Sequence, residues 1–177
     1  RLSQFYKENP AQAYKYANEL TQSIHQPEFA VAGNGLANQT ASYNDILEST
    51  VAEWKKYQDN FDGGPTRSPK FPLPNNYEFL LRYAIDKKDH ALLNHVNLTL
   101  KKMAYGGIYD QIGGGFARYS TDSAWKIPHF EKMLYDNAQL ISLYSKAYQV
   151  NNDPLYKQIV SETAAFLKRE MSDGNGK

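Results

Sequence analysis

Hydrophobic and polar positions follow one another along most of this chain with the period of an α-helix. Apolar side chains recur three and four positions apart, whereas the long alternation that indicates β-strands is missing. The predicted helices cover residues 10–25, 42–58, 75–86 and 89–103, a segment that begins at Pro128, and residues 154–171. The pattern therefore predicts an all-α fold.

Residues with helix-starting and helix-ending chemistry mark the ends of these segments. Ser42, followed three positions later by Asp45, has the form of a capping box, and Pro128 lies where a first turn accepts proline. Gly106 and Gly107 predict a left-handed helix end, because glycine adopts positive φ without steric cost. The helix from Pro128 is predicted to bury a stripe of Phe130, Leu134, Ala138, Ile141 and Tyr144.

The connections between the helices are alternately short and long. Connections of about two to five residues are typical of antiparallel helical hairpins. The long connections, 26–40, 61–74 and 106–127, are rich in turn residues and glycine or proline, and they carry a faint repeat: FDGG, PKF and NNYEFLLRY are echoed by IGGG, PHF and DNAQLISLY. This repeat aligns Lys70 with His129, and repeated hairpins predict a solenoid or a closed toroid.

Composition narrows the classes of function. With 177 residues the chain fits one packed unit, and its 20 basic and 19 acidic residues are scattered, so no nucleic-acid partner is expected. No apolar run approaches the roughly 18 residues of a membrane span, and RLSQFYKENP lacks the apolar region of a secretory signal. Cysteine is absent, which excludes thiol chemistry. We expect a soluble, cytoplasmic protein with no membrane partner.

Polar and aromatic side chains are densest in the stretch GGIYDQIGGGFARYSTDSAWKIPHFEKMLYDNAQL, residues 106–140. Glycoside hydrolysis needs two carboxylates beside a pocket, and Asp110 and Glu131 are candidates for that pair. His129 acting with a carboxylate could instead move a proton next to a sugar carbonyl, as an epimerase or isomerase does. The 14 tyrosines of the chain suit either a sugar cleft or wide helix contacts, and their helical spacing favours the core for most of them.

A purely structural interpretation of the same residues stays open. Glu131 near a helix N-terminus is favoured by the helix dipole, whatever its function. His129 and Glu131 would point about 200° apart on an ideal helix, so they form no obvious dyad there. Arg118 could pair with Asp110 or Asp122 to lock the connection. Lys132 and Asp136 have the spacing of an ordinary ion pair on a helix.

Cofactors are not expected. The three consecutive glycines follow no strand, so they do not form a phosphate-binding fingerprint. The four histidines show neither HxxxH nor HExxH spacing, so no metal site is predicted.

The stretch 106–140, together with PKFPLPNNYEFLLRYA, resembles the signature of the thioredoxin-domain-containing family related to spermatogenesis-associated proteins. The resemblance covers residues 61–171. It departs from the pattern at Pro65, where members usually carry an aromatic residue, and at Ala117, where many carry histidine. In that family a thioredoxin-like domain precedes a six-hairpin, glycosidase-like helical toroid.

The resemblance implies an organisation and a site. Residues 1–40 would lead from a thioredoxin-like domain, and residues 41–177 would form the N-terminal half of an (α/α) toroid, an incomplete ring. The toroid's likeness to glycoside hydrolases and N-acylglucosamine 2-epimerases implies a carbohydrate ligand. The implied catalytic residues are Asp110, His129 and Glu131, and the implied substrate-binding residues are Arg118, Tyr119, Asp122, Trp125 and Asp136.

A second function is kept beside the first. The helices could form a non-catalytic interaction module that recruits a partner to the thioredoxin-like domain, with the polar cluster serving structure alone. In either case half a ring would expose apolar surface, so we expect the fragment to self-associate and to be inactive when isolated.

Overall fold

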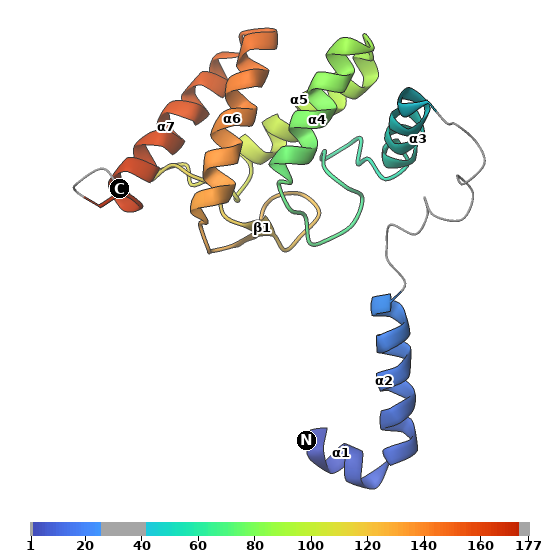
Figure 1. Ribbon diagram of the computed structural model, residues 1–177. Helices are drawn as coiled ribbons and strands as arrows, with labels where there is room; N and C mark the ends of the chain where they lie inside the picture. The colour runs from blue at the N-terminus through green and yellow to red at the C-terminus, as the bar shows by residue number, and fades with distance from the viewer. Residues whose placement is uncertain (1, 26–41, 174–177) are drawn as a thin grey trace. The chain divides into compact units, whose positions relative to one another are not determined.

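The computed structural model describes residues 2–25 and 42–173, and in these ranges it is mostly helical, with seven helices and one two-stranded sheet (Figure 1). This agrees with the predicted all-α class. The chain divides into two compact units, Arg1–Glu48 and Ser49–Lys177, which are described one at a time. The connection predicted over residues 26–40 lies outside the described residues.

The first unit contains α1 (Leu2–Glu8) and α2 (Pro10–His25). The bounds of α2 are those predicted from the sequence, whereas α1 was not predicted. The rings of Tyr6 and Tyr14 pack edge to face, with centroids 5.9 Å apart and hydroxyls 3.0 Å apart. The helix α3 (Tyr43–Lys55) begins in this unit.

The predicted cap of α3 is present. The main-chain N–H of Ser42 donates to Asp45 Oδ2 at 3.2 Å, which is the reciprocal arm of a capping box.

The second unit holds two helical hairpins. The helix α4 (Pro74–Asp86) packs against α5 (His90–Tyr105), and α6 (Leu134–Asn151) packs against α7 (Pro154–Glu170). Contacts between α4 and α6 join the hairpins, and the loops gather at the end where α4 and α6 begin (Figure 1). The shared core is built mainly from α4–α7 and includes Leu80, Leu81, Val96, Leu100, Met103, Leu140, Leu143, Tyr144 and Tyr156.

None of the helices in the described ranges combines the length and apolarity that a bilayer-crossing segment requires.

The helix predicted to begin at Pro128 begins six residues later. Pro128–His129 instead form the strand β2, which pairs antiparallel with β1 (Tyr119–Ser120). Phe130 is consequently not in the buried stripe, and its side chain is 89% exposed. The stripe that α6 does bury consists of Asn137, Leu140, Leu143, Tyr144 and Ala147.

The predicted left-handed helix end at Gly106 is wrong, because its backbone is extended, with φ −80° and ψ 171°. Glycine is needed there for another reason. A Cβ on Gly106 would lie 2.5 Å from the carbonyl oxygen of Trp125, and one on Gly107 would lie 2.0 Å from that of Lys126. The two glycines therefore allow two parts of the same connection to touch.

The two glycine turns are one structural motif used twice, in the first loop (residues 56–73) and the second loop (residues 106–133). Each turn opens with an aspartate whose Oδ1 accepts main-chain N–H groups two and three residues later. Both turns then place two glycines at positive φ. These are Gly63 and Gly64 in the first loop, and Gly114 and Gly115 in the second.

A lysine closes each turn. Lys70 Nζ bonds Asp59 Oδ2 at 2.7 Å and the Gly63 carbonyl at 2.6 Å. Lys132 Nζ bonds Asp110 Oδ2 at 2.8 Å and the carbonyl of Gly114 at 2.8 Å. The structural partner of Lys70 is therefore Lys132, which corrects the alignment of Lys70 with His129.

The second loop covers the first. Lys70 and Ser120 exchange two main-chain hydrogen bonds, at 2.9 and 2.8 Å. The ring of Trp125 packs on Gly64, with the Lys70 ammonium 5.6 Å from the ring centroid. Because of this cover the side chain of Lys70 is fully buried. The two loops therefore pack together as one folded substructure at the end of the hairpins where α4 and α6 begin.

Candidate functional site

Three of the eight residues proposed from the sequence lie in the scaffold of the second loop. Asp110 is one, since its carboxylate accepts from the amides of Ile112 and Gly113 and from Lys132. The Gly113 amide, the Lys132 ammonium and the Ile112 amide lower the pKa of Asp110 to about 2. A carboxyl with this pKa is ionised at neutral pH and cannot donate a proton to a leaving group.

Asp122 and Trp125 are the other two. Burial acts to raise the pKa of Asp122, but hydrogen bonds from the amides of Ala124, Ile127 and Lys126 outweigh it, and the pKa is lowered. This carboxylate therefore holds a tight turn of the second loop. Trp125 is fully buried, and its Nε1–H donates to the main-chain carbonyl of Asp62 at 2.9 Å. Its ring presents no face to a ligand.

Of the remaining five residues, four lie in the second loop, in or beside β1 and β2, and Asp136 lies in the first turn of α6. Arg118 Nη1 bonds Glu131 Oε2 at 3.1 Å, and His129 Nδ1 lies 3.6 Å from the same oxygen. His129 and Glu131 can meet because His129 lies in the strand β2 and Glu131 follows it outside any helix. The divergence expected from a helix does not apply, because the helix starts later. Arg118 pairs with Glu131 and not with Asp110 or Asp122.

Stacked aromatic rings pack against the His129 side of this cluster. The ring of Tyr119 stacks on that of His129, with centroids 4.7 Å apart and an interplanar angle of 16°. Phe71 stacks on Tyr119 as well, and their ring centroids are also 4.7 Å apart. The stack joins β1, β2 and the first loop. The Nδ1 atom of His129 is buried and has no hydrogen-bond partner within bonding distance, so the ring is held by stacking more than by hydrogen bonds.

A groove of about 290 Å³ lies beside the cluster, where α4 and α6 begin. Three segments of the chain supply its walls: the end of the first loop with the first turn of α4, one residue of the second loop, and the first turns of α6. The residues that line it are Phe71, Pro72, Leu73, Pro74, Asn75, Asn76, Arg118, Tyr135, Asp136 and Gln139.

Asp136 is the groove's acidic group. It lies in the first turn of α6, half-buried, and the structure shows no hydrogen bond from a described residue to its carboxylate. Burial raises the pKa of Asp136, and the nearby charge of Arg118 only partly opposes this. Lys132, the helical partner expected for it, bonds Asp110 instead. Asp136 thus remains available to a ligand.

The chain was compared with known proteins. No family model matches it. Spermatogenesis-associated protein 20 of Homo sapiens is 34% identical over 181 residues, which cover 99% of this chain and 23% of that protein. The Mus musculus protein of the same name is 43% identical over 160 residues, covering 88% of this chain and 20% of the relative. The chain is homologous to a segment of spermatogenesis-associated protein 20.

An uncharacterised Caenorhabditis elegans protein is also similar, with 45% identity over 152 residues, 81% of this chain and 20% of that protein. The chain thus spans about a fifth of the length of the curated relatives it matches. The similarity to spermatogenesis-associated protein 20 includes the second loop and the helices on either side of it, since it covers nearly the whole chain in the human protein.

Sequence reasoning missed several residues of the groove. Phe71 was quoted only as part of a repeated block, and Asn75 and Asn76 were interpreted as helix caps. Gln139 carried no signal of its own, since a lone glutamine on a polar helix face is common. The signal that could have found them is the repeat itself, because it places the starts of α4 and α6 in equivalent positions.

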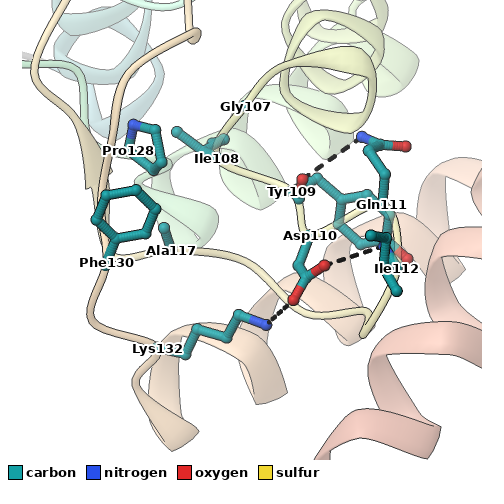
Figure 2. A pocket seen from close by; sticks show the side chains of 10 residues that line it. All are labelled: Gly107, Ile108, Tyr109, Asp110, Gln111, Ile112, Ala117, Pro128, Phe130 and Lys132. Atoms are coloured by element: carbon teal, nitrogen blue, oxygen red, sulfur yellow. Dashed lines mark hydrogen bonds and ion pairs between the residues drawn. The ribbon is translucent and has the colours of Figure 1, made fainter.

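A second groove, of about 380 Å³, is lined by residues of the second loop (Figure 2). Its floor includes the buried side chains of Ile108 and Ala117, and the ring of Phe130 stands beside Pro128 and Ala117 at one edge. The ion pair of Lys132 with Asp110 closes another edge (Figure 2). The lining of this groove is more apolar than that of the groove beside Asp136.

The described parts of the chain bring no three metal-ligating side chains together.

The pKa of Asp136 gives a stability prediction. Its folded-state pKa is raised above the unfolded value of about 4. The free energy of unfolding therefore falls as the pH rises from the unfolded-state pKa through the folded-state pKa. We expect Asp136→Asn to leave the melting temperature at pH 7 unchanged or to raise it, and the difference to vanish below about pH 4. Thermal melts of both proteins at about pH 3 to 8 measure how the difference in melting temperature depends on pH. A lower melting temperature at pH 7 would mean that the carboxylate is structural.

Proposed function

We propose that the groove beside Asp136 binds a carbohydrate, and that in the whole protein this segment forms one wall of the cleft of a helical toroid. Support for the ring comes from the two adjacent hairpins, with α4 packed against α6, and from the repeated loop motif at their ends. Repeats of this kind pack side by side and can close on themselves.

The lining of the groove carries the proposal. Sugars offer hydroxyls that donate and accept hydrogen bonds, together with flat apolar faces. The groove offers an uncommitted carboxyl in Asp136, the amides of Asn75, Asn76 and Gln139, and the guanidinium of Arg118. The rings of Phe71 and Tyr135 are partly exposed beside them and supply stacking faces.

A glycosidase-like or epimerase-like reaction would use the same groups. Asp136, whose pKa burial raises, is better suited than Asp110 to hold a proton for a leaving oxygen. Glu131, paired with Arg118, would act as the second carboxylate, with His129 beside it. This moves the acid role from Asp110 in the second loop to Asp136 in the first turn of α6.

Calorimetric titration of a panel of monosaccharides, disaccharides and phosphosugars into this chain, alone and within the whole protein, tests the proposal. We expect at least one sugar to bind, and Arg118→Met and Asp136→Asn each to weaken it about tenfold or more, because a charge-assisted hydrogen bond is lost. Asp86→Asn, at the opposite end of α4, is the matched control and should bind as the unmodified chain does. Binding that both groove variants retain would overturn the proposal.

A non-catalytic interaction module attached to a thioredoxin-like domain is the second candidate. The large exposed ring of Phe130 at the edge of an apolar groove favours it. If the polar cluster served structure alone, His129→Ala and Glu131→Gln would each lower the melting temperature. Both side chains are about half exposed, so under the carbohydrate proposal we expect stability changes within about 0.5 kcal/mol.

A further inference from the structure

The charges of the groove beside Asp136 are not balanced within the described residues. Arg118 and Asp136 are the two charged side chains that line this groove. Arg118 already pairs with Glu131, at 3.1 Å. The carboxylate of Asp136, half-buried in the first turn of α6, takes part in no hydrogen bond or ion pair within residues 2–25 and 42–173. The groove therefore holds an acidic group that lacks a counter-charge in the described chain.

The cations near Asp136 are committed to other carboxylates. Lys132, four positions before it, bonds Asp110 at 2.8 Å. Arg118 acts on Asp136 only through its nearby charge, which lowers the pKa of this carboxyl less than burial raises it. A cationic group on a ligand would supply the missing counter-charge, and it would do so in a partly desolvated position, where an ion pair is stronger than in open water.

The uncharged part of the lining suits an ammonium as well. An ammonium has three donors and no acceptor, and the amide oxygens of Asn75, Asn76 and Gln139 are acceptors in the same groove. The rings of Phe71 and Tyr135 are partly exposed there, and the faces of aromatic rings attract cations. The carboxylate, the amides and the rings thus all favour a cation.

Size and charge narrow the ligand further. The volume of the groove, about 290 Å³, lies at the lower limit of ligand pockets, which hold about 300–1,000 Å³, and this favours a single sugar unit. A phosphosugar or a uronic acid would bring another negative charge close to Asp136 and Glu131, and like charges repel. An acylated amine is uncharged and would leave Asp136 without a counter-charge.

We propose that the groove selects a monosaccharide with a free primary amine, whose ammonium pairs with Asp136 while the sugar ring packs against Phe71 and Tyr135. The inference rests on the carbohydrate site proposed above and names the class of sugar that this site takes. It does not rest on the acid role of Asp136, which is ionised in this complex because a nearby cation favours the charged form. A charge-assisted hydrogen bond is about twice as strong as a neutral one, so the amine distinguishes this sugar from its hydroxyl counterpart.

Sugars that differ at one substituent test the proposal. Glucosamine, galactosamine and mannosamine are each compared with the parent hexose and with the N-acetyl form, so that an ammonium, a hydroxyl and a neutral amide occupy the same position. They are titrated calorimetrically into this chain and into the whole protein at about pH 6, where a primary amine is protonated and the carboxyl of an aspartate is ionised. We expect at least one free amino sugar to bind about tenfold or more tightly than both of its counterparts.

Matched variants assign the preference to the groove. Asp136→Asn should abolish it, so that the amino sugar and the parent hexose bind within about twofold of each other. Asp86→Asn, at the opposite end of α4, is the control and should keep the preference.

The outcomes separate this inference from the carbohydrate site itself. Sugar binding without a preference for the free amine, a preference for phosphosugars, or a preference for the amine that Asp136→Asn leaves intact would overturn the inference. A sugar that binds without such a preference, and that Arg118→Met and Asp136→Asn weaken, would leave the carbohydrate site standing. Binding of no sugar, whether from this set or from the panel described above, would overturn both.

Discussion

Replacing Trp125 with alanine is expected to lower the free energy of unfolding by about 3–5 kcal/mol. The ring is fully buried between the two loops, and its Nε1–H satisfies the carbonyl of Asp62. The substitution opens a cavity and removes that hydrogen bond. It also uncovers the ammonium of Lys70, which lies over the ring. Urea denaturation of the two proteins, followed by circular dichroism, measures the difference.

Phe130→Ala is the control for this prediction. Phe130 lies five residues further along the same loop, but its side chain is 89% exposed, so we expect a change within about 0.5 kcal/mol. If Trp125→Ala prevents folding altogether, Trp125→Phe keeps most of the buried area and makes the comparison possible. Equal effects of Trp125→Ala and Phe130→Ala would contradict the assignment of Trp125 to the scaffold.

Asparagine at the two motif aspartates is the second large prediction. Asp59→Asn leaves the ammonium of Lys70 buried without a counter-charge, which costs about 3–5 kcal/mol. Asp110→Asn removes the same interaction from a lysine that water reaches, so we expect about 1–2 kcal/mol. The difference between the two variants in chemical denaturation isolates the effect of the cover. Costs that agree within about 0.5 kcal/mol would show that burial of the first pair contributes little.

The carboxylate of Asp110 also makes the free energy of unfolding depend on pH in acid. Hydrogen bonds and Lys132 lower the pKa of Asp110 to about 2, below the unfolded value of about 4. The stabilisation is therefore complete above about pH 4 and is lost as the pH falls towards 2. The stability curve of Asp110→Asn should accordingly be flatter than that of the unmodified chain between these two pH values.

The helices were predictable because their determinants are local. The bounds of α2 follow from Pro10 and good helix formers, and Asp89 and Asp153 accept hydrogen bonds at the starts of α5 and α7. The late start of α6 was not predictable in this way. Pro128 suits a first helical turn and an edge strand alike, and the choice is made by pairing with β1, a partner several residues away in sequence.

The residue types of the site could be predicted from the sequence, but not which of these residues serve structure and which line a groove. The second loop does hold the polar and aromatic residues expected of it, yet sequence spacing cannot tell which aspartates bind main-chain amides and which face a groove. Asp110 and Asp122 take the first role and Asp136 the second because of glycine turns and tertiary contacts that period and charge do not encode. Trp125, expected to bind the substrate, instead packs its ring against Gly64.

The repeat was visible in the sequence and misaligned at one point. The similarity of PKF to PHF aligns Lys70 with His129. The lysine that closes the second turn lies three residues after His129, at Lys132. The extra residues between the glycines and this lysine form β1 and β2. Insertions of this kind shift an alignment while leaving the hydrogen-bonding motif intact.

Amide chemical-shift mapping of the chain during titration with a sugar that binds it is the most direct test of the central claim, that the groove beside Asp136 binds carbohydrate whereas Asp110 serves structure. The account predicts that the largest shifts fall at Arg118, Tyr135, Asp136 and Gln139, while the amides of Ile112 and Gly113, held by Asp110, stay unchanged. Shifts concentrated at Ile112 and Gly113, or at Phe130 and the apolar groove, with none around Asp136, would contradict it.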